Sequence, residues 1–194
     1  MDAQEQIVKE ILALTEAAGI PIWFYGSFAL RALEGRSRRP HGDIDFFTRF
    51  QDQDRLRQAL SSTGFELVKA GSHWTTYTRR DQWINCNTFK RLDDGTPVTD
   101  AGEEGVWPWP DNSFPGEPNG VLFGKPVRAL SYEGQYVSKA RWQLYDPREP
   151  LRDIDKQDLE IMCQRIPEDV RERLAAFFYP LPGTRKRYPG EKNG

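Results

Sequence analysis

Two aspartates, Asp43 and Asp45, stand one residue apart in the stretch GDIDFF and are the first candidates for chemistry. On a β-strand, residues i and i+2 project from the same face, so both carboxylates would lie together while Ile44 enters a core. Carboxylates held this close repel each other, and a divalent cation that prefers hard oxygen ligands relieves the repulsion. The pair therefore predicts a magnesium site, against the simpler alternative of a solvated strand face with Asp43 as a turn residue.

Gly26 and Ser27 lie between the apolar stretch Pro21 to Tyr25 and a helical pattern. A glycine here lets a phosphate approach the backbone, and the free N–H groups and dipole of a helix N-terminus attract anions. The Ser27 hydroxyl can add a hydrogen bond. An ordinary turn and helix cap would explain these two residues alone. A phosphate cradle followed by a carboxylate pair, however, supplies both halves of a nucleotide–metal site.

Hydrophobic periodicity predicts the elements that must position these residues. Ile7, Ile11 and Leu14 stand at helical spacing, whereas the segments around the aspartates have the short apolar runs of buried strands. The expected elements are helices at 3–18, 28–34 and 52–64, strands at 21–25, 43–48, 65–68, 75–78 and 83–89, a hairpin at 121–130, and helices from 131, at 154–165 and at 168–178.

These elements predict an α+β chain, with strands and helices mixed in the N-terminal half and helices in the C-terminal third. We expect an α/β domain over 1–130, in which the Gly-, Pro- and acid-rich stretch 92–119 is a long loop or an ordered insertion. A linker follows at 145–150, inside a helical subdomain over 131–180, and 181–194 is expected to be a flexible tail.

The composition limits the class of protein. The chain has 194 residues, 38% hydrophobic and 29% charged, which suffices for one core and a smaller subdomain. A net charge of −2 gives no overall basic field for nucleic acid, and no apolar stretch approaches the roughly 20 residues of a membrane span. Two cysteines and two histidines disfavour a disulfide framework and a cysteine or histidine metal site. Without a secretory signal, the expected location is cytoplasmic.

The stretch YGSFALRALEGRSRRPHGDIDFF resembles the signature of the nucleotidyltransferase superfamily that includes DNA polymerase β. The closer resemblance is to the small aminoglycoside adenylyltransferases and lincosamide nucleotidyltransferases. It continues more weakly through GVLFGKPVRALSYEGQYVSKARW and LRDIDKQDLEIM. It implies a nucleotidyltransferase fold, a mixed sheet with flanking helices plus a C-terminal helical bundle. It also implies transfer of a nucleoside monophosphate from a nucleoside triphosphate, ATP above all, to an acceptor.

The resemblance also assigns roles to residues. It places Gly26 and Ser27 at the triphosphate and makes Asp43 and Asp45 the ligands of Mg²⁺. Lys139 matches a lysine that reaches the triphosphate, although a solvated helix lysine is an equal alternative. Two residues that flank the acids, Arg39 and His41, either contact phosphate or hold the loop.

The resembling enzymes use a third carboxylate on a neighbouring strand, but the comparable stretch here is WINCNTF, with Asn85 and Asn87 on the expected face. An amide takes no proton at neutral pH, although its oxygen can bind a metal weakly. Three explanations compete. Asp81, Asp93 or Asp94 supplies the acid, with His73 as a spare base; substrate or water replaces the base; or the protein binds its ligands without turnover.

The acceptor is less defined than the nucleotide. The acidic stretch 92–119 would suit a polycationic aminoglycoside, with Trp107 and Trp109 as a wall, unless it is a solvated loop with both tryptophans packed on the core. The first hypothesis is a magnesium-dependent nucleotidyltransferase that modifies a small hydroxylated molecule such as an aminoglycoside or lincosamide. The alternatives are a weak or inactive relative that serves as a binding module, and a toxin-like enzyme that modifies protein or RNA. The expected partners are a nucleoside triphosphate and the acceptor, with no membrane or nucleic acid, in a monomer or homodimer.

Overall fold

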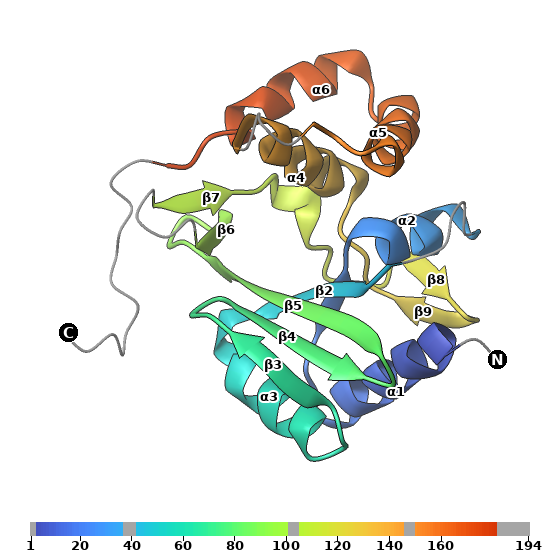
Figure 1. Ribbon diagram of the computed structural model, residues 1–194. Helices are drawn as coiled ribbons and strands as arrows, with labels where there is room; N and C mark the ends of the chain where they lie inside the picture. The colour runs from blue at the N-terminus through green and yellow to red at the C-terminus, as the bar shows by residue number, and fades with distance from the viewer. Residues whose placement is uncertain (1–2, 37–41, 101–104, 146–149, 182–194) are drawn as a thin grey trace.

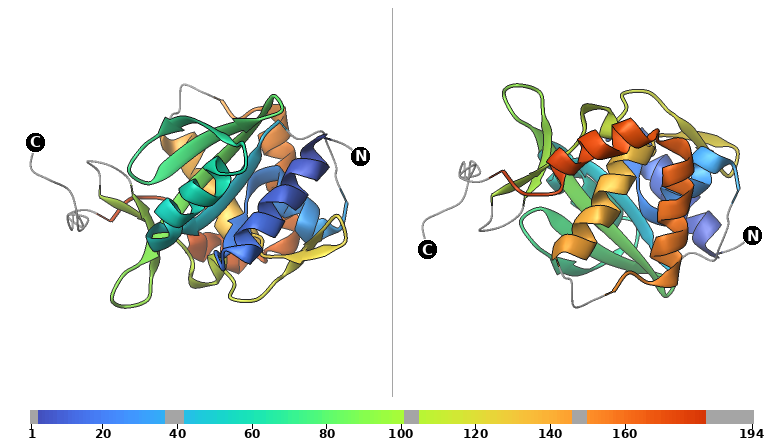
Figure 2. Two further views of the ribbon diagram at one scale, coloured as in Figure 1. Left: turned by 90° about the horizontal axis from the view of Figure 1, so that it is seen from below. Right: turned by 90° about the horizontal axis from the view of Figure 1, so that it is seen from above.

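The chain folds in three layers, shown by a computed structural model that describes residues 3–36, 42–100, 105–145 and 150–181, apart from the side chains of 142–145 (Figure 1). Helices α1 (Ala3–Ala17) and α3 (Gln53–Ser61) cover one face of a central sheet, and the C-terminal helices lie over the other. Figure 2 shows these two helical layers from below and from above. The central strands of the sheet therefore lie between two helical layers, whereas the edge strand β3 (Glu66–Ala70) stays exposed.

The sheet is mixed. Its main strands are β1 (Ile22–Phe24), β2 (Ile44–Arg49), β5 (Gln82–Arg91), β4 (Trp74–Arg79) and β3 (Glu66–Ala70), in this spatial order. β2 and β5 are parallel, whereas the β1–β2, β4–β5 and β3–β4 pairs are antiparallel. The parallel register sets Ile44 beside Ile84 and Asp45 beside Asn85. Residues far apart in the chain therefore meet on adjacent strands.

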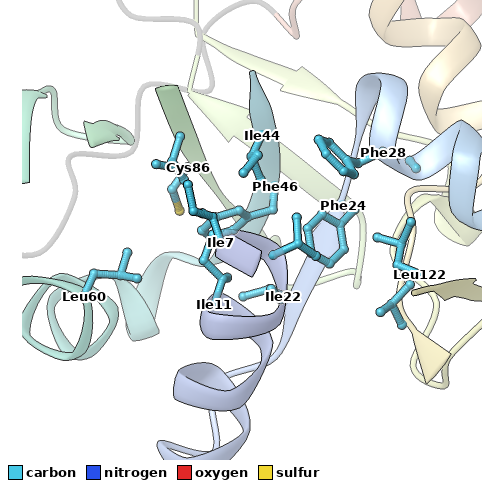
Figure 3. Close-up of a cluster of buried hydrophobic side chains, with 14 of the residues drawn as sticks. Ile7, Ile11, Ile22, Phe24, Phe28, Ile44, Phe46, Leu60, Cys86 and Leu122 are labelled. Atoms are coloured by element: carbon cyan, nitrogen blue, oxygen red, sulfur yellow. The ribbon is translucent and has the colours of Figure 1, made fainter. Parts of the chain in front are cut away.

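The main core lies between the sheet and the first helical layer. Ile7 and Ile11 of α1 and Leu60 of α3 are fully buried there, in one cluster with the strand residues Ile44 and Phe46 (Figure 3). Because successive side chains of a strand point to opposite faces, burial of Ile44 and Phe46 on this side directs Asp45 to the other. The helical and strand periodicities thus decide together on which face the carboxylate appears.

Short connections join these elements. Helix α2 (Gly26–Glu34) follows β1 almost directly, and the 3₁₀ turn η1 (Phe50–Asp52) joins β2 to α3. The hairpin of β8 (Gly120–Leu122) and β9 (Lys125–Val127) packs against α2, close to the position expected from the sequence. Buried Leu122 carries this hairpin into the main core.

The stretch 92–119 has secondary structure of its own, as an ordered insertion would. β6 (Pro97–Asp100) pairs with the end of β5 and with β7 (Val106–Pro108), and the 3₁₀ turn η3 (Asp111–Ser113) follows. A largely aromatic cluster, called the aromatic cluster below, includes two residues of this insertion and covers the second face of the sheet; it consists of Trp23, Phe47, Phe89, Trp109, Phe114 and Leu130. The insertion therefore serves the fold by closing the sheet face beyond the carboxylates.

The C-terminal part is helical. It consists of α4 (Tyr132–Tyr145), α5 (Asp153–Arg165), α6 (Glu168–Leu174) and the 3₁₀ turn η4 (Ala175–Phe177). These helices share a third core, in which Val137 and Met162 are fully buried. The expected fold class, α+β with a mixed sheet, flanking helices and a C-terminal bundle, is confirmed; the domain boundaries stay a prediction.

In the part of the chain that the structure describes, no helix is both long enough and apolar enough to cross a membrane.

Candidate active site

Asp43 and Asp45 meet Asn85 on the second face of the sheet. Asp43 directly precedes β2, Asp45 is its second residue, and Asn85 is the partner of Asp45 on β5. The Asn85 side-chain amide donates through Nδ2 to Oδ2 of Asp43 at 3.1 Å and to Oδ1 of Asp45 at 3.0 Å. One neutral amide therefore bridges two half-buried carboxylates, in the position where a cation would relieve their repulsion.

The surroundings perturb the Asp45 carboxyl strongly. Burial, followed by the charge of Asp43, raises the pKa of Asp45 to about 7, although the hydrogen bond from Asn85 and the charge of Lys139 oppose the rise. Burial makes any charge on this carboxyl costly, and the charge of Asp43 makes a second negative charge beside it costly as well. Binding of a positively charged ligand beside the two carboxylates would therefore be favourable.

The donor set fits a hard divalent cation. Mg²⁺ is commonly held by one or two carboxylates together with substrate phosphate and water, and Asp43 and Asp45 provide those carboxylates. Among the described residues, no group of three or more His, Cys, Asp or Glu side chains is placed to hold a metal. Asn85 stands where the resemblance led us to expect a third carboxylate. Its Oδ1 accepts a hydrogen bond from Thr76 Oγ1 at 3.1 Å, which directs its N–H groups at the acids.

Gly26 brings the N-terminus of α2 beside Asp45. Its φ is +64°, and a Cβ at this position would lie 3.3 Å from Oδ2 of Asp45. The backbone N–H of Tyr25 donates to the carbonyl of Asp45 at 3.1 Å, and Ser27 is buried in the first turn of the helix. Sequence analysis expected a phosphate cradle next to the acids, and the structure brings Gly26 and Ser27 together with Asp45.

Gly26→Ala should therefore affect both stability and ligand binding. We expect a loss of about 1–2 kcal/mol in the free energy of unfolding, because an L side chain at positive φ is strained. We also expect weaker magnesium–nucleotide binding, because the new methyl group displaces Asp45. Gly35→Ala is the matched control: Gly35 has φ +71° but nothing within 4 Å of an added Cβ. Equal effects of both variants on nucleotide titrations would contradict the role of Gly26.

Tyr25 is a site residue that the sequence reasoning missed. Its hydroxyl accepts a hydrogen bond from Nδ2 of Asn87 at 2.8 Å. Burial, then the charges of Asp45 and Asp43, raise the pKa of Tyr25 well above its ordinary value. The phenol therefore stays protonated at neutral pH and extends the polar site along β5. Its place directly before Gly26 in the sequence is the signal that could have indicated it.

Lys139 of α4 links the helical part to the site. Its ammonium forms an ion pair with Asp155 and lies 3.4 Å from Oδ2 of Asp158, both on α5. Burial would raise the pKa of Asp155, but hydrogen bonds from Arg152 and Lys139 lower it to about 2. The charge of Lys139 also acts on Asp45. The Lys139 ammonium therefore acts on the Asp45 carboxylate while Asp155 and Asp158 hold it in place.

Arg152 completes this cationic group. Its guanidinium contacts Asp155 through Nε at 2.8 Å, and its charge interacts with Asp43. The sequence reasoning did not single out Arg152, Asp155 or Asp158. Two acids three residues apart on one helix, both largely buried, are unusual unless paired, and this spacing was the available signal.

Lys139→Met should lower the free energy of unfolding by about 3 kcal/mol, because it leaves two buried carboxylates with less compensation. Lys156→Met is the control: Lys156 pairs with Asp153 on the exposed side of α5, and its loss should cost less than about 1 kcal/mol. Urea unfolding measures both. Similar small losses would mean that the Lys139 ion pair is not structural.

The other candidate acids and the candidate base lie away from the carboxylate pair. Asp81 is in the turn before β5, four residues ahead of Asn85, which corresponds to about 13 Å along a strand. Asp93 and Asp94 follow the far end of β5, where Asp94 accepts from the backbone of Thr96. His73 lies beside Asp100, 3.6 Å from its carboxylate, and burial lowers its pKa.

Three further expectations have different outcomes. Arg39 and His41 lie outside the described residues. Trp109 is buried in the aromatic cluster, with Nε1 donating to Thr99 Oγ1 at 3.2 Å, so this residue packs on the core as the alternative expected. Trp107 is half-buried and lies under the guanidinium of Arg141.

The comparison with protein families fits this geometry. The model of the aminoglycoside-2''-adenylyltransferase family matches residues 7–162, which include the glycine–serine turn, both aspartates, Asn85 and the α5 acids. The chain belongs to this family. The expected nucleotidyltransferase relationship is confirmed, and the protein is a nucleotidyltransferase.

Similar proteins agree with the assignment. 2''-Aminoglycoside nucleotidyltransferases from Escherichia coli and Klebsiella pneumoniae are 25% identical over 130 residues, covering 67% of this chain and 69% of theirs. The crystal structure of ANT(2'')-Ia in complex with adenylyl-2''-tobramycin has a TM-score of 0.78 at 22% identity, over 91% of this chain and 97% of that one. Lincomycin-bound LnuA, a lincosamide adenylyltransferase, has 0.64 at 20%, over 84% and 96%. At these identities the solved structures show the shared fold.

In this nucleotidyltransferase, the amide of Asn85 is therefore the feature that needs a functional account. It occupies the strand position at which the family resemblance led us to expect an acid, and its side chain contacts Asp43, Asp45 and Thr76. Because an amide accepts no proton at neutral pH, another group must take the proton of an attacking hydroxyl, or the reaction must proceed without a general base.

Proposed function

We propose that this nucleotidyltransferase transfers a nucleoside monophosphate from a nucleoside triphosphate, ATP in the first instance, to a hydroxyl group of a small molecule. The observation that carries the proposal is the Asp43–Asp45 pair directly beside the N-terminus of α2 at Gly26. Mg²⁺, when bound by these two carboxylates, would supply charge stabilisation for the phosphates and the leaving group.

The chain's own groups would orient the donor. Free backbone N–H groups at the start of α2 attract the triphosphate oxygens, and Gly26 leaves them accessible. Lys139 and Arg152 face the carboxylates from the helical part, so their positive charges can meet the far phosphates once nucleotide is bound. These cations are already held by Asp155, which reduces the entropy lost on binding.

The proposed reaction runs without a dedicated carboxylate base. Asn85 cannot accept a proton, and the raised pKa of Tyr25 keeps its phenol protonated. A missing general base costs about 10²–10⁴ in rate. We therefore propose a slow enzyme in which positioning and charge stabilisation carry the catalysis.

For the acceptor, the names of the relatives support an aminoglycoside or lincosamide antibiotic. ANT(2'')-Ia was solved with adenylyl-2''-tobramycin and LnuA with lincomycin. The donor requires a compartment that contains nucleoside triphosphates, and we propose the cytoplasm. The second candidate function is nucleotide binding without turnover, which Asn85 favours because it replaces an acid with an amide.

Calorimetric titration tests the proposal. ATP, GTP, CTP and UTP are titrated with Mg²⁺ into the wild type and Asp43→Asn, with Asp81→Asn as a control that changes an exposed acid in the turn before β5. We expect one nucleotide to bind with Mg²⁺ and at least tenfold weaker binding in Asp43→Asn only. Absence of magnesium-dependent binding in the wild type would overturn the site.

Mass spectrometry then separates the two candidate functions. The protein is incubated with the bound nucleotide, Mg²⁺ and either tobramycin or lincomycin. A product heavier by one nucleoside monophosphate residue, absent with Asp43→Asn, supports transfer to that acceptor. Binding without any product on either acceptor would favour the binding function.

A further inference from the structure

A cavity of about 660 Å³ lies at the opposite end of β2 and β5 from the carboxylate pair. It is bounded by the start of β1, the end of β2 with η1, the end of β5, and residues that follow η3 and β9. We call it the basic–aromatic cavity after its two kinds of lining side chain. Its volume lies within the range of small-molecule sites, about 300–1,000 Å³.

Four cationic side chains line the basic–aromatic cavity: Arg49, Lys90, Arg91 and Arg128. No carboxylate is among the described residues that line it. Arg91 and Arg128 donate to backbone carbonyls, those of Gly95 and Gly116, each at 2.7 Å. These carbonyls orient the guanidinium groups without neutralising them, so the cavity keeps a positive charge.

Among the described residues, Arg49 is the lining arginine that has an acidic neighbour. Its Nε lies 2.6 Å from Oδ2 of Asp52, while Oδ1 of the same carboxylate is 3.0 Å from Arg55. One buried acid is therefore shared by two arginines. The region around the end of β2 remains cationic even after this ion pair is counted.

Rigid aromatic rings form one wall of the cavity. Trp23, Phe89 and Phe114 are each at most 5% exposed, and Phe89 and Phe114 stack with their centroids 3.7 Å apart. Trp23 meets Phe89 edge-on at 5.1 Å and donates through Nε1 to the carbonyl of Pro115 at 2.8 Å. Arg128 lies over Trp23, 6.0 Å from the ring centroid. The wall is thus preformed and carries a cation at its edge.

The cavity is separate from the carboxylate site. Arg49 lies four residues beyond Asp45 on β2, and Arg91 six beyond Asn85 on β5, which correspond to about 13 and 20 Å along a strand. The aromatic cluster, with Phe47 of β2 among its members, occupies the sheet face between them. A ligand in one place does not fill the other.

We propose that the basic–aromatic cavity binds a second nucleotide, a nucleoside monophosphate or diphosphate, without a metal ion. Arginine guanidinium groups match phosphate oxygens in bidentate geometry, and the planar base has aromatic and aliphatic surface to pack against. Because the cations neutralise the phosphate directly and no described carboxylate lines the cavity, a divalent cation has no role there. The site is independent of the transfer reaction.

Titration of AMP in the presence of EDTA tests this site. We expect binding to the wild type, at least tenfold weaker binding to Arg91→Gln and to Arg128→Gln, and unchanged binding to Asp43→Asn. Arg173→Gln is the matched control, since Arg173 is an exposed arginine on α6. Adenosine and inorganic phosphate, titrated separately, should each bind more weakly than AMP. Failure of AMP to bind in EDTA, or equal loss in Asp43→Asn, would overturn the proposal.

Amide chemical shifts give a second readout on the unmodified protein, should a variant fold poorly. AMP in EDTA should shift the signals of Phe50, Gln51, Lys90 and Arg91. Shifts confined to Gly26 and Ser27 would place the nucleotide at α2 instead and exclude the cavity. Because both tests omit magnesium, their failure would leave the magnesium-dependent binding at Asp43 and Asp45 unaffected, so the two proposals fail separately.

Discussion

Asn85→Asp should raise the rate of magnesium-dependent nucleotidyl transfer about 100-fold, the lower end of the range for a general acid–base group. The side chain lies 3.1 Å and 3.0 Å from the two aspartates, so a carboxylate there would join them as a metal ligand or a proton acceptor. Thr76 Oγ1 can donate to the new carboxylate as it does to the amide oxygen. The gain should appear in kcat, because the new group acts on the attacking hydroxyl rather than on nucleotide binding.

In the absence of a metal ion, Asn85→Asp should lower the free energy of unfolding. It removes two hydrogen bonds to Asp43 and Asp45 and adds a third negative charge, so the variant should unfold more easily in EDTA and recover with Mg²⁺. Asn87→Asp is the matched control, two residues along the same face of β5, where the amide contacts Tyr25 instead of the acids. A rate that falls in Asn85→Asp would show that the amide itself has a catalytic role. Equal gains in both variants would exclude a specific effect of position 85.

The free energy of unfolding in EDTA should fall as the pH rises from 4 to 7, by up to about 4 kcal/mol through Asp45 alone. The folded pKa of Asp45 is about 7, against an ordinary value of 3.8. Between these values the folded protein holds a proton that the unfolded chain has released, so rising pH favours unfolding. The contribution is complete below pH 4 and lost above pH 7.

Asp45→Asn removes this titration. Its unfolding free energy, measured in urea, should exceed that of the wild type at pH 8 but not at pH 4. Asp81→Asn, at an exposed turn, should follow the wild type at every pH. Mg²⁺ should stabilise the wild type increasingly toward pH 8, where the carboxylates are charged, and should have less effect on Asp45→Asn. If the unfolding free energies of wild type and Asp45→Asn changed with pH in parallel, Asp45 would not have a raised pKa in the folded protein.

Local patterns accounted for much of the fold and for half of the site. Alternation of Ile44 and Phe46 with Asp45 placed the carboxylate on the second face, and the Gly26–Ser27 turn came where strand and helix periodicities change. These are short-range consequences of side-chain direction and backbone freedom, which a single sequence carries. They sufficed to predict an α+β chain with the two aspartates beside a glycine–serine turn, whereas the nucleotidyltransferase fold was predicted from the resemblance of this stretch to that superfamily.

The remaining features depend on tertiary pairing, which local patterns do not specify. The bridge from Asn85 to both acids needs the register of β2 against β5, and the burial of Asp155 needs Lys139 from another helix. The sequence left open whether Trp109 packs on the core, and it did not indicate that Phe114 packs against Phe47. The basic–aromatic cavity likewise combines segments from five parts of the chain, none of which is distinctive alone.

The parallel pairing of β2 with β5 has a consequence for how the molecule folds. The chain leaves β2 at Arg49 and returns at Gln82, so α3, β3 and β4 lie between the two strands. Pairing over such a separation requires closure of a long loop, which makes it slower than forming the neighbouring β4–β5 hairpin. The contact between Asp45 and Asn85 should therefore form late in refolding. During refolding, magnesium-dependent nucleotide binding would then recover only when the sheet is complete, after the circular dichroism signal of the helices has returned.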